Sequence, residues 1–226
     1  MDKKLLEIKR QIRKWIKLDY IVPEDIPDIE LYMDQVTRFM DIHLAGNKRL
    51  REDKTLTKTM INNYSKNKLL PSPVNKKYSK EHIIILIYIY YLKNVISIGD
   101  IEKLLFPMTE RYFDSGRLFK IYEQIYEIEK VEYFNIESST ARAAAITEKM
   151  FPKDEDEYLN KMAFIYLLSY DIFSKKRLIE KLIDELPAVK TPQEAKKEAK
   201  EARKNKAKKT VMTKKQIRQK IDKQKK

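Results

Sequence analysis

The sequence contains no cysteine, so a disulfide bond, a thiolate metal site and a cysteine nucleophile are all excluded. Only three of its 226 residues are glycine and only two are histidine. None of the short motifs that mark phosphate-binding loops, dinucleotide sites, zinc proteases or serine hydrolases occurs in it. We therefore expect no enzymatic activity and no cofactor.

The two histidines are His43 and His82, and each stands at an end of an expected helix. Neither is surrounded in the sequence by the Asp, Glu and His residues that a metal ion requires, and a histidine at a helix end is usually structural. We expect no metal site.

Long hydrophobic runs are also absent. The longest, near residues 83–92, is too short to cross a bilayer, and residues 1–20 lack the apolar core of a secretory signal. These observations predict a soluble, cytoplasmic protein without a membrane partner.

The composition itself favours helices. The chain is 42% hydrophobic, which is enough for a core, and it is dense in Leu, Ile, Lys and Glu. Because helices favour these residues and tolerate little glycine, we predict an all-α fold.

The positive charge is concentrated in two segments. The formal net charge is +14, and residues 190–226 carry +12 of it, from 16 basic and 4 acidic residues. Residues 48–82 carry +7, from 10 basic and 3 acidic residues, whereas residues 99–189 carry −5. A basic patch confined to one part of a folded region is typical of a nucleic-acid-binding surface.

The basic patch contains a helix with two different faces, predicted over residues 58–66. At about 100° per residue, Met60, Ile61 and Tyr64 fall on one side. Polar residues fill the other side: Lys58, Thr59, Asn62 and Lys66, with Asn63 at the rim. Asparagine pairs with adenine and lysine neutralises phosphate, although an ordinary surface helix has the same pattern.

Proline ends this helix, and the residues that follow predict a loop and two more helices. Leu69, Leu70 and Pro71 form the turn, and a short basic loop with Lys76 and Lys77 leads to Tyr78. Ser79 is the expected N-cap of a helix over residues 80–93 that is apolar nearly all round, and therefore buried. Ser97 is the expected cap of a short helix that ends near residue 105.

This order of elements resembles the MerR-type winged helix-turn-helix of bacterial regulators. Residues 98–105 resemble the fourth helix of that module, and residues 29–105 resemble a Firmicute domain-of-unknown-function family thought to carry it. Asn62 stands where the MerR pattern has arginine, Lys68 stands where it has glycine, and the wing is short and lacks glycine. The residues that carry the resemblance are Ile61, Tyr64, Leu69, Leu70, Pro71 and Tyr78.

The resemblance implies a transcriptional regulator that binds double-stranded DNA. By this analogy Thr59, Asn62 and Asn63 contact bases. Phosphate contacts are expected from Lys58, Tyr64, Lys66, Lys76 and Lys77, with Tyr78 completing the DNA-binding set. A single recognition helix buries little surface, so we expect a homodimer that reads two half-sites. The resemblance does not identify an effector.

The rest of the chain predicts further helices. In the first half they cover residues 3–19 and 28–44, with Asp28 as N-cap and Gly46 as C-cap of the second. In the second half a helix over residues 109–131 is either interrupted or started late near Gly116, and it is followed by a helix over 138–150 and one capped by Asp154. Residues 174–186 either continue that helix or form another.

These patterns divide the chain into four regions. Residues 1–47 are N-terminal helices, 48–106 the DNA-binding region, 107–189 a helical dimerisation or sensing region, and 190–226 a lysine-rich tail. The tail has too few apolar residues to fold, so we expect it to be disordered and either to bind nucleic acid without specificity or to aid solubility.

An alternative from a different class stays open. A non-enzymatic helical scaffold or adaptor with a basic surface for RNA, an acidic protein or a membrane has the same composition. A preference for one DNA sequence distinguishes the regulator from this adaptor.

Overall fold

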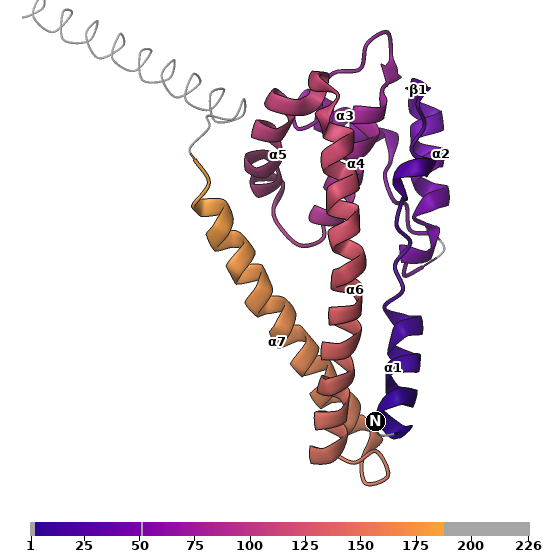
Figure 1. Ribbon diagram of the computed structural model, residues 1–226, viewed down its shortest axis with the longest axis vertical. Coiled ribbons are helices and arrows are strands. Elements are labelled where there is room, and N and C mark those ends of the chain that lie inside the picture. The colour runs from indigo at the N-terminus through magenta and orange to yellow at the C-terminus, as the bar shows by residue number, and fades with distance from the viewer. Residues whose placement is uncertain (1–2, 51, 188–226) are drawn as a thin grey trace, which may run out of the picture. The chain divides into compact units, whose positions relative to one another are not determined.

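The computed structural model describes residues 3–50 and 52–187. They form a mostly helical fold with two short strands, which confirms the all-α prediction in its coarse form. Figure 1 shows these elements. In chain order they are α1 (Lys3–Trp15), η1 (Pro23–Asp25), β1 (Leu31–Tyr32), α2 (Met33–His43), η2 (Ala45–Asn47), α3 (Lys58–Lys66), β2 (Lys77–Tyr78), α4 (Lys80–Leu92), α5 (Ile98–Tyr112), η3 (Phe113–Ser115), α6 (Arg117–Met150) and α7 (Glu157–Asp184).

Helix α4 is the centre of the core, as its apolar sequence predicts. Ile84, Ile85 and Leu86 have no exposed surface, and α4 contacts β2, α5 and α6. The N–H of Ser79, the predicted N-cap, donates to Nδ1 of His82 over 3.0 Å, which fixes the first turn. Apolar side chains on every face of α4 are therefore buried, which places this helix at the centre of the core.

Helix α6 is a single helix of 34 residues, so the predicted break between residues 131 and 138 is wrong. No proline or glycine stands there to end it, and its partners support its middle. Glu137 is buried and binds Arg13 of α1, with Nε–Oε2 2.7 Å apart. The helix begins after Gly116, whose φ of 70° is the left-handed turn that glycine adopts without strain.

Two further boundaries differ from the sequence prediction. Helix α5 continues past residue 105 and through Pro107 to Tyr112, because Leu105 and Thr109 are buried on either side of the proline. Helix α7 is capped by Asp156, whose carboxylate accepts from the N–H of Leu159 over 2.8 Å, rather than by Asp154. It runs through residue 174, so the continuous-helix alternative is confirmed.

Helix α2 begins at Met33, five residues later than predicted. The residues before it form β1, which pairs antiparallel with β2, Leu31 opposite Tyr78. Asp28 therefore caps no helix, and its carboxylate instead binds Lys80 of α4. The pairing buries Leu31 and Tyr78 together, which is a stronger constraint on this segment than the helical pattern.

Gly46 is also not the C-cap of α2. It lies inside the short 3₁₀ turn η2, and its N–H donates to the carboxylate of Asp19 over 2.6 Å. The predicted cap is wrong because this glycine serves a close approach to another segment.

No helix in the described ranges is both long and apolar enough to span a membrane. The lysine-rich tail, residues 190–226, lies outside the described residues.

Candidate nucleic-acid interface

Helix α3 has the bounds predicted from the sequence, residues 58–66. Thr57 caps it, with Oγ1 accepting from the N–H of Met60 over 3.1 Å. Ile61 and Tyr64 are buried in the core, and the helix contacts α2. One side of α3 is therefore fixed to the fold, although ten residues separate the end of η2 from its start.

The opposite side is open to solvent. All five polar residues that the sequence places there are exposed: Lys58, Thr59, Asn62, Asn63 and Lys66. We call this set the outer face of α3. It offers hydroxyl and amide groups flanked at both ends by ammonium groups, which suits an anionic partner that also carries hydrogen-bonding edges.

The turn after α3 is held in a strained backbone conformation. Lys68 has a φ of 61°, where glycine is favoured, and glycine is what the MerR pattern has here. The carbonyl of Tyr64 accepts from the N–H groups of Leu69 and Leu70 over 2.9 and 3.2 Å. Both leucines are buried, so they anchor the turn and leave Lys68 exposed beside Lys66.

The basic loop is a tight hairpin, which we call the wing hairpin, residues 74–78. Val74 forms a bridge with Lys77, whose N–H donates to the carbonyl of Val74 over 2.9 Å. Asn75 and Lys76 have φ values of 50° and 63°, as in a two-residue type I′ turn. Glycine is usual at the second position, so its replacement by lysine hid this turn from the sequence analysis.

The lysines of this surface fall into two groups. Lys58 binds Asp34 of α2, and the ammonium of Lys77 lies 3.7 Å from Glu30 and 5.8 Å from the centre of the Tyr32 ring. Within the described residues, no carboxylate lies within ion-pair distance of Lys66, Lys68 or Lys76. These three cations are therefore available to phosphate without breaking an internal pair, and Lys68 was missed by the sequence analysis.

Tyr64 and Tyr78, two further predicted contacts, are both buried. Burial raises the pKa of each phenol, which keeps both rings neutral. The structure gives these tyrosines a packing role under α3 and under the wing hairpin. A phosphate contact by either residue stays a prediction.

The loop between α2 and α3 is fixed by Asp41. Its carboxylate lies 2.8 Å from the ammonium of Lys48 and accepts from Oγ1 of Thr55 over 3.0 Å. The hydrogen bond from Lys48 is the main reason that the pKa of Asp41 is lowered. The ammonium of Lys48 is thus paired with Asp41, whereas Arg49 and Lys54 of the same loop are exposed.

Both histidines contact aromatic side chains of the fold. Nδ1 of His43 lies 3.6 Å from a carboxylate oxygen of Asp25, and its ring contacts Phe39. The buried ring of His82 packs edge-on against Tyr78 and Phe113. In the part of the chain that the structure describes, no three His, Asp or Glu side chains are grouped to hold a metal ion.

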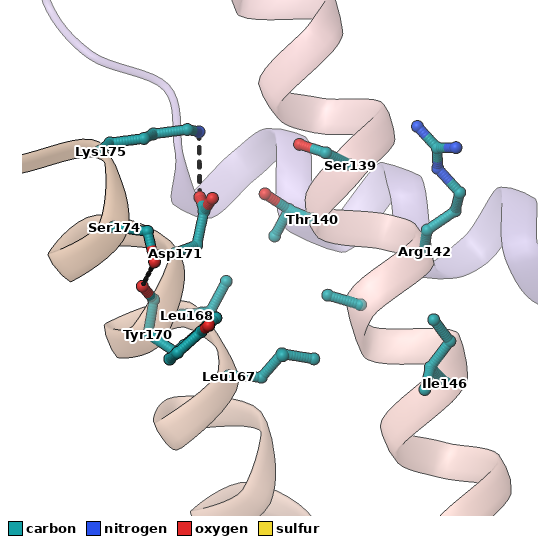
Figure 2. Close-up of a pocket in the computed structure, with 11 residues that line it drawn as sticks. Ser139, Thr140, Arg142, Ile146, Leu167, Leu168, Tyr170, Asp171, Ser174 and Lys175 are labelled. Atoms are coloured by element: carbon teal, nitrogen blue, oxygen red, sulfur yellow. Dashed lines mark hydrogen bonds and ion pairs between the residues drawn. The ribbon is translucent and has the colours of Figure 1, made fainter. Parts of the chain in front are cut away.

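A cleft of about 540 Å³ lies between α6 and α7. Figure 2 shows that Asp171 binds Lys175 and that Oγ of Ser174 donates to the carbonyl of Tyr170, over 3.0 and 2.9 Å. These polar groups of α7 therefore bond within their own helix.

Comparison with known protein families identifies a similarity over part of the chain. Residues 21–128 match a protein family described as Domain of unknown function (DUF1836). This range contains β1, α2, α3, the wing hairpin, α4, α5 and the first part of α6. No curated protein matches the chain, and no solved structure matches it.

Proposed function

We propose that this protein is a DNA-binding transcriptional regulator of the MerR-like type. In this proposal α2 and α3 form the helix pair, with α3 as the recognition helix in the major groove. The wing hairpin contacts the neighbouring phosphate backbone. The observation that carries the proposal is the outer face of α3, five exposed polar residues on a helix whose other side is buried.

The division of labour between residues follows from their chemistry. Thr59, Asn62 and Asn63 have the short hydrogen-bonding groups that read base edges. Lys66, Lys68 and Lys76 contact phosphates directly because no carboxylate of residues 3–50 or 52–187 competes for them. Lys58 and Lys77 contact phosphates only by giving up Asp34 and Glu30, so their contribution is smaller.

The positions of strained backbone residues support the proposal that the end of α3 and the wing hairpin contact DNA. In the described ranges, the non-glycine residues with positive φ are Lys68, Asn75 and Lys76, and all three lie at the end of α3 or in the wing hairpin. A left-handed conformation costs a residue with a side chain roughly 1 kcal/mol relative to glycine. Lysine at two such positions places positive charge where the fold alone favours glycine.

The proposal includes a homodimer. Helix α7 has apolar residues on the side away from α6 as well as on the side towards it. Tyr158, Met162, Ile165, Ser169 and Ile172 recur at alternating spacings of four and three, the spacing of a coiled-coil seam, and we call them the α7 stripe. The four apolar members are exposed, so a second copy of α7 is the partner that this face fits.

The test begins with selection of bound sequences from a random pool of double-stranded DNA. The selected site and a scrambled site are then titrated with the native protein, with Asn62→Ala and with Asn135→Ala. Asn62→Ala should cost about 1–3 kcal/mol at the selected site and much less at the scrambled one. Asn135 is another exposed asparagine, on α6, so Asn135→Ala should leave both affinities unchanged.

Thermal unfolding of both variants is the control for structure. Asn62 is exposed, so the melting temperature of Asn62→Ala should match that of the native protein. If selection enriches no sequence, or if the protein binds RNA and scrambled DNA equally well, the adaptor alternative replaces the regulator.

A further inference from the structure

A second hollow lies between α6 and the segment that joins α1 to η1. Its volume is about 350 Å³, within the range of small-molecule sites. Tyr126, Tyr133 and Phe134 of α6 form one wall, and Leu18 and Tyr20 of the joining segment form the other. Glu129 and Lys130 complete the lining, and we call this hollow the aromatic pocket.

The rings of the aromatic pocket are held in place by contacts outside it. The hydroxyl of Tyr133 donates to the carbonyl of Arg13 over 3.2 Å, which fixes its ring against the end of α1. Tyr20 stacks on Tyr91 of α4 with ring centres 6.1 Å apart. The hydroxyl of Tyr91 in turn donates to the carbonyl of Asp19 over 2.8 Å. A ligand therefore meets walls that are already formed.

The carboxylate of Glu129 is the unusual group of the pocket. It is half-buried, and among the described residues it has no hydrogen-bond or ion-pair partner. Burial raises its pKa. Three tyrosines near it form no hydrogen bond to it, since Tyr91 and Tyr122 donate to the carbonyls of Asp19 and Ile21, and the hydroxyl of Tyr88 has no hydrogen-bond partner among the described residues. A half-buried carboxylate without a partner is costly, and a cation in the pocket removes that cost.

Lys130 does not supply that cation. Its ammonium lies 2.6 Å from Glu127 and 4.7 Å from the centre of the Tyr126 ring. The charges of Lys130 and Glu127 compensate each other, so the negative charge of Glu129 has no compensating cation within the described ranges. Because Lys130 already stands over Tyr126, the rings left for a ligand are those of Tyr20, Tyr133 and Phe134.

We propose that the aromatic pocket binds a hydrophobic organic cation, with its ammonium group between the tyrosine rings and the carboxylate of Glu129. Quaternary and tertiary amines fit this chemistry because they are poorly hydrated and need no strong hydrogen-bond acceptor. An anion is disfavoured by Glu129. A neutral molecule of the same shape gains the apolar contacts and none of the charge interaction. This site does not depend on DNA binding.

The test uses phenyltrimethylammonium and its neutral isostere tert-butylbenzene as probes of the full-length protein. Binding is followed by calorimetry and by the upfield proton shift that tyrosine rings impose on methyl groups stacked over them. The cation should bind and show this shift, and the isostere should bind at least about tenfold more weakly.

Two variants assign the contacts. Glu129→Gln keeps the shape and removes the charge, and it should weaken cation binding about tenfold without changing the affinity for tert-butylbenzene. Glu123→Gln makes the same change at an exposed position of α6 outside the pocket, and it should have no effect. Phe134→Leu removes one ring from the exposed rim and should weaken both probes.

Weaker binding by Glu129→Gln would not result from unfolding. The substitution removes a half-buried charge, so the variant is expected to be at least as stable as the native protein. Equal affinity for the two probes, or equal cation affinity in Glu129→Gln and Glu123→Gln, overturns the proposal. So does the absence of binding by the cation at millimolar concentration.

Discussion

The carboxylate of Asp19 accepts a hydrogen bond from the backbone N–H of Gly46 over 2.6 Å, and a side chain at residue 46 would require Asp19 to move. A Cβ atom at residue 46 would lie 2.5 Å from Oδ2 of Asp19. Asn47 strengthens the link, because its side chain accepts from the N–H of Asp19 and donates to its carbonyl over 2.7 and 2.9 Å. The segment after α1 is thereby tied to the end of α2.

We expect Gly46→Ala to destabilise the protein by about 1–3 kcal/mol, because Asp19 must move and its hydrogen bond is lost. Gly99→Ala is the matched control. A Cβ at Gly99 of α5 meets its nearest atom, Oγ of Ser97, at 3.8 Å, so alanine fits there and is favoured in a helix. Urea unfolding measures both variants. Equal stability of Gly46→Ala and the native protein would contradict the close-approach role.

The Asp19–Gly46 contact also shows where sequence analysis ends. A glycine soon after a predicted helix indicates a C-cap locally, and only the fold reveals a carboxylate 27 residues away. Helices α3 and α4 were predictable because their burial pattern repeats within a few residues. Strand β1 was not, since its partner β2 lies beyond two helices and a long loop.

The candidate DNA-binding site likewise has features that the sequence predicted and features that only the fold reveals. Exposure of Asn62 and burial of Ile61 follow from helical spacing and were predicted. The pairing of Lys58 with Asp34 and of Lys77 with Glu30 depends on how α2 and β1 approach them, so the sequence did not separate free from paired lysines. The left-handed turn at Lys76 was missed because lysine is a rare residue for it.

Acid should destabilise the protein through His82. Burial lowers the pKa of His82, and its Nδ1 accepts from the N–H of Ser79, which requires the neutral ring. The unfolded chain binds a proton near the ordinary pKa of about 6.5, whereas the folded chain does not. Stability is therefore intact above that pH and falls as the pH drops towards the folded pKa, by about 1.4 kcal/mol for each pH unit between the two values.

His82→Gln tests this assignment, because glutamine keeps an acceptor for the N–H of Ser79 and does not titrate. Urea unfolding between pH 8 and pH 5 should give a flatter dependence for the variant. Loss of ring packing on Tyr78 and Phe113 should lower its stability at every pH. A decline as steep as that of the native protein would assign the acid sensitivity to other groups.

Lys76 should show opposite effects on stability and on DNA binding. Lys76→Gly relieves the left-handed backbone and should stabilise the protein by about 0.5–1 kcal/mol. It also removes a phosphate contact, so affinity should fall for all DNA sequences and the salt slope should decrease by about one unit. Lys76→Ala removes the charge and keeps the strain, so it should weaken DNA binding equally without the gain in stability.

Thermal unfolding and titration at several salt concentrations measure these effects. Lys77→Ala is the comparison, since Lys77 is near Glu30 and should contribute less to the salt slope. If Lys76→Gly binds DNA as tightly as the native protein, the wing hairpin is not a DNA contact.

The α7 stripe predicts a dimer, and a single substitution in the stripe should dissociate it into monomers. Ile165, at the middle of the stripe, is 63% exposed, and a coiled-coil pairing with a second copy buries it. Ile165→Glu places a charge in that interface and should shift the protein from dimer to monomer, with a dissociation constant raised at least about a hundredfold. Sedimentation equilibrium at micromolar concentration measures the mass of each form.

Leu178→Glu is the control, because Leu178 is 60% exposed on the same helix and lies about half a turn away from the stripe. It should remain a dimer. The monomeric Ile165→Glu variant should keep its helicity, since Ile165 is exposed within one copy, and it should bind a single half-site weakly while losing the tight binding of a two-half-site DNA. A native protein that sediments as a monomer with and without DNA contradicts the dimer, and a dimer that survives Ile165→Glu places its interface elsewhere on the chain.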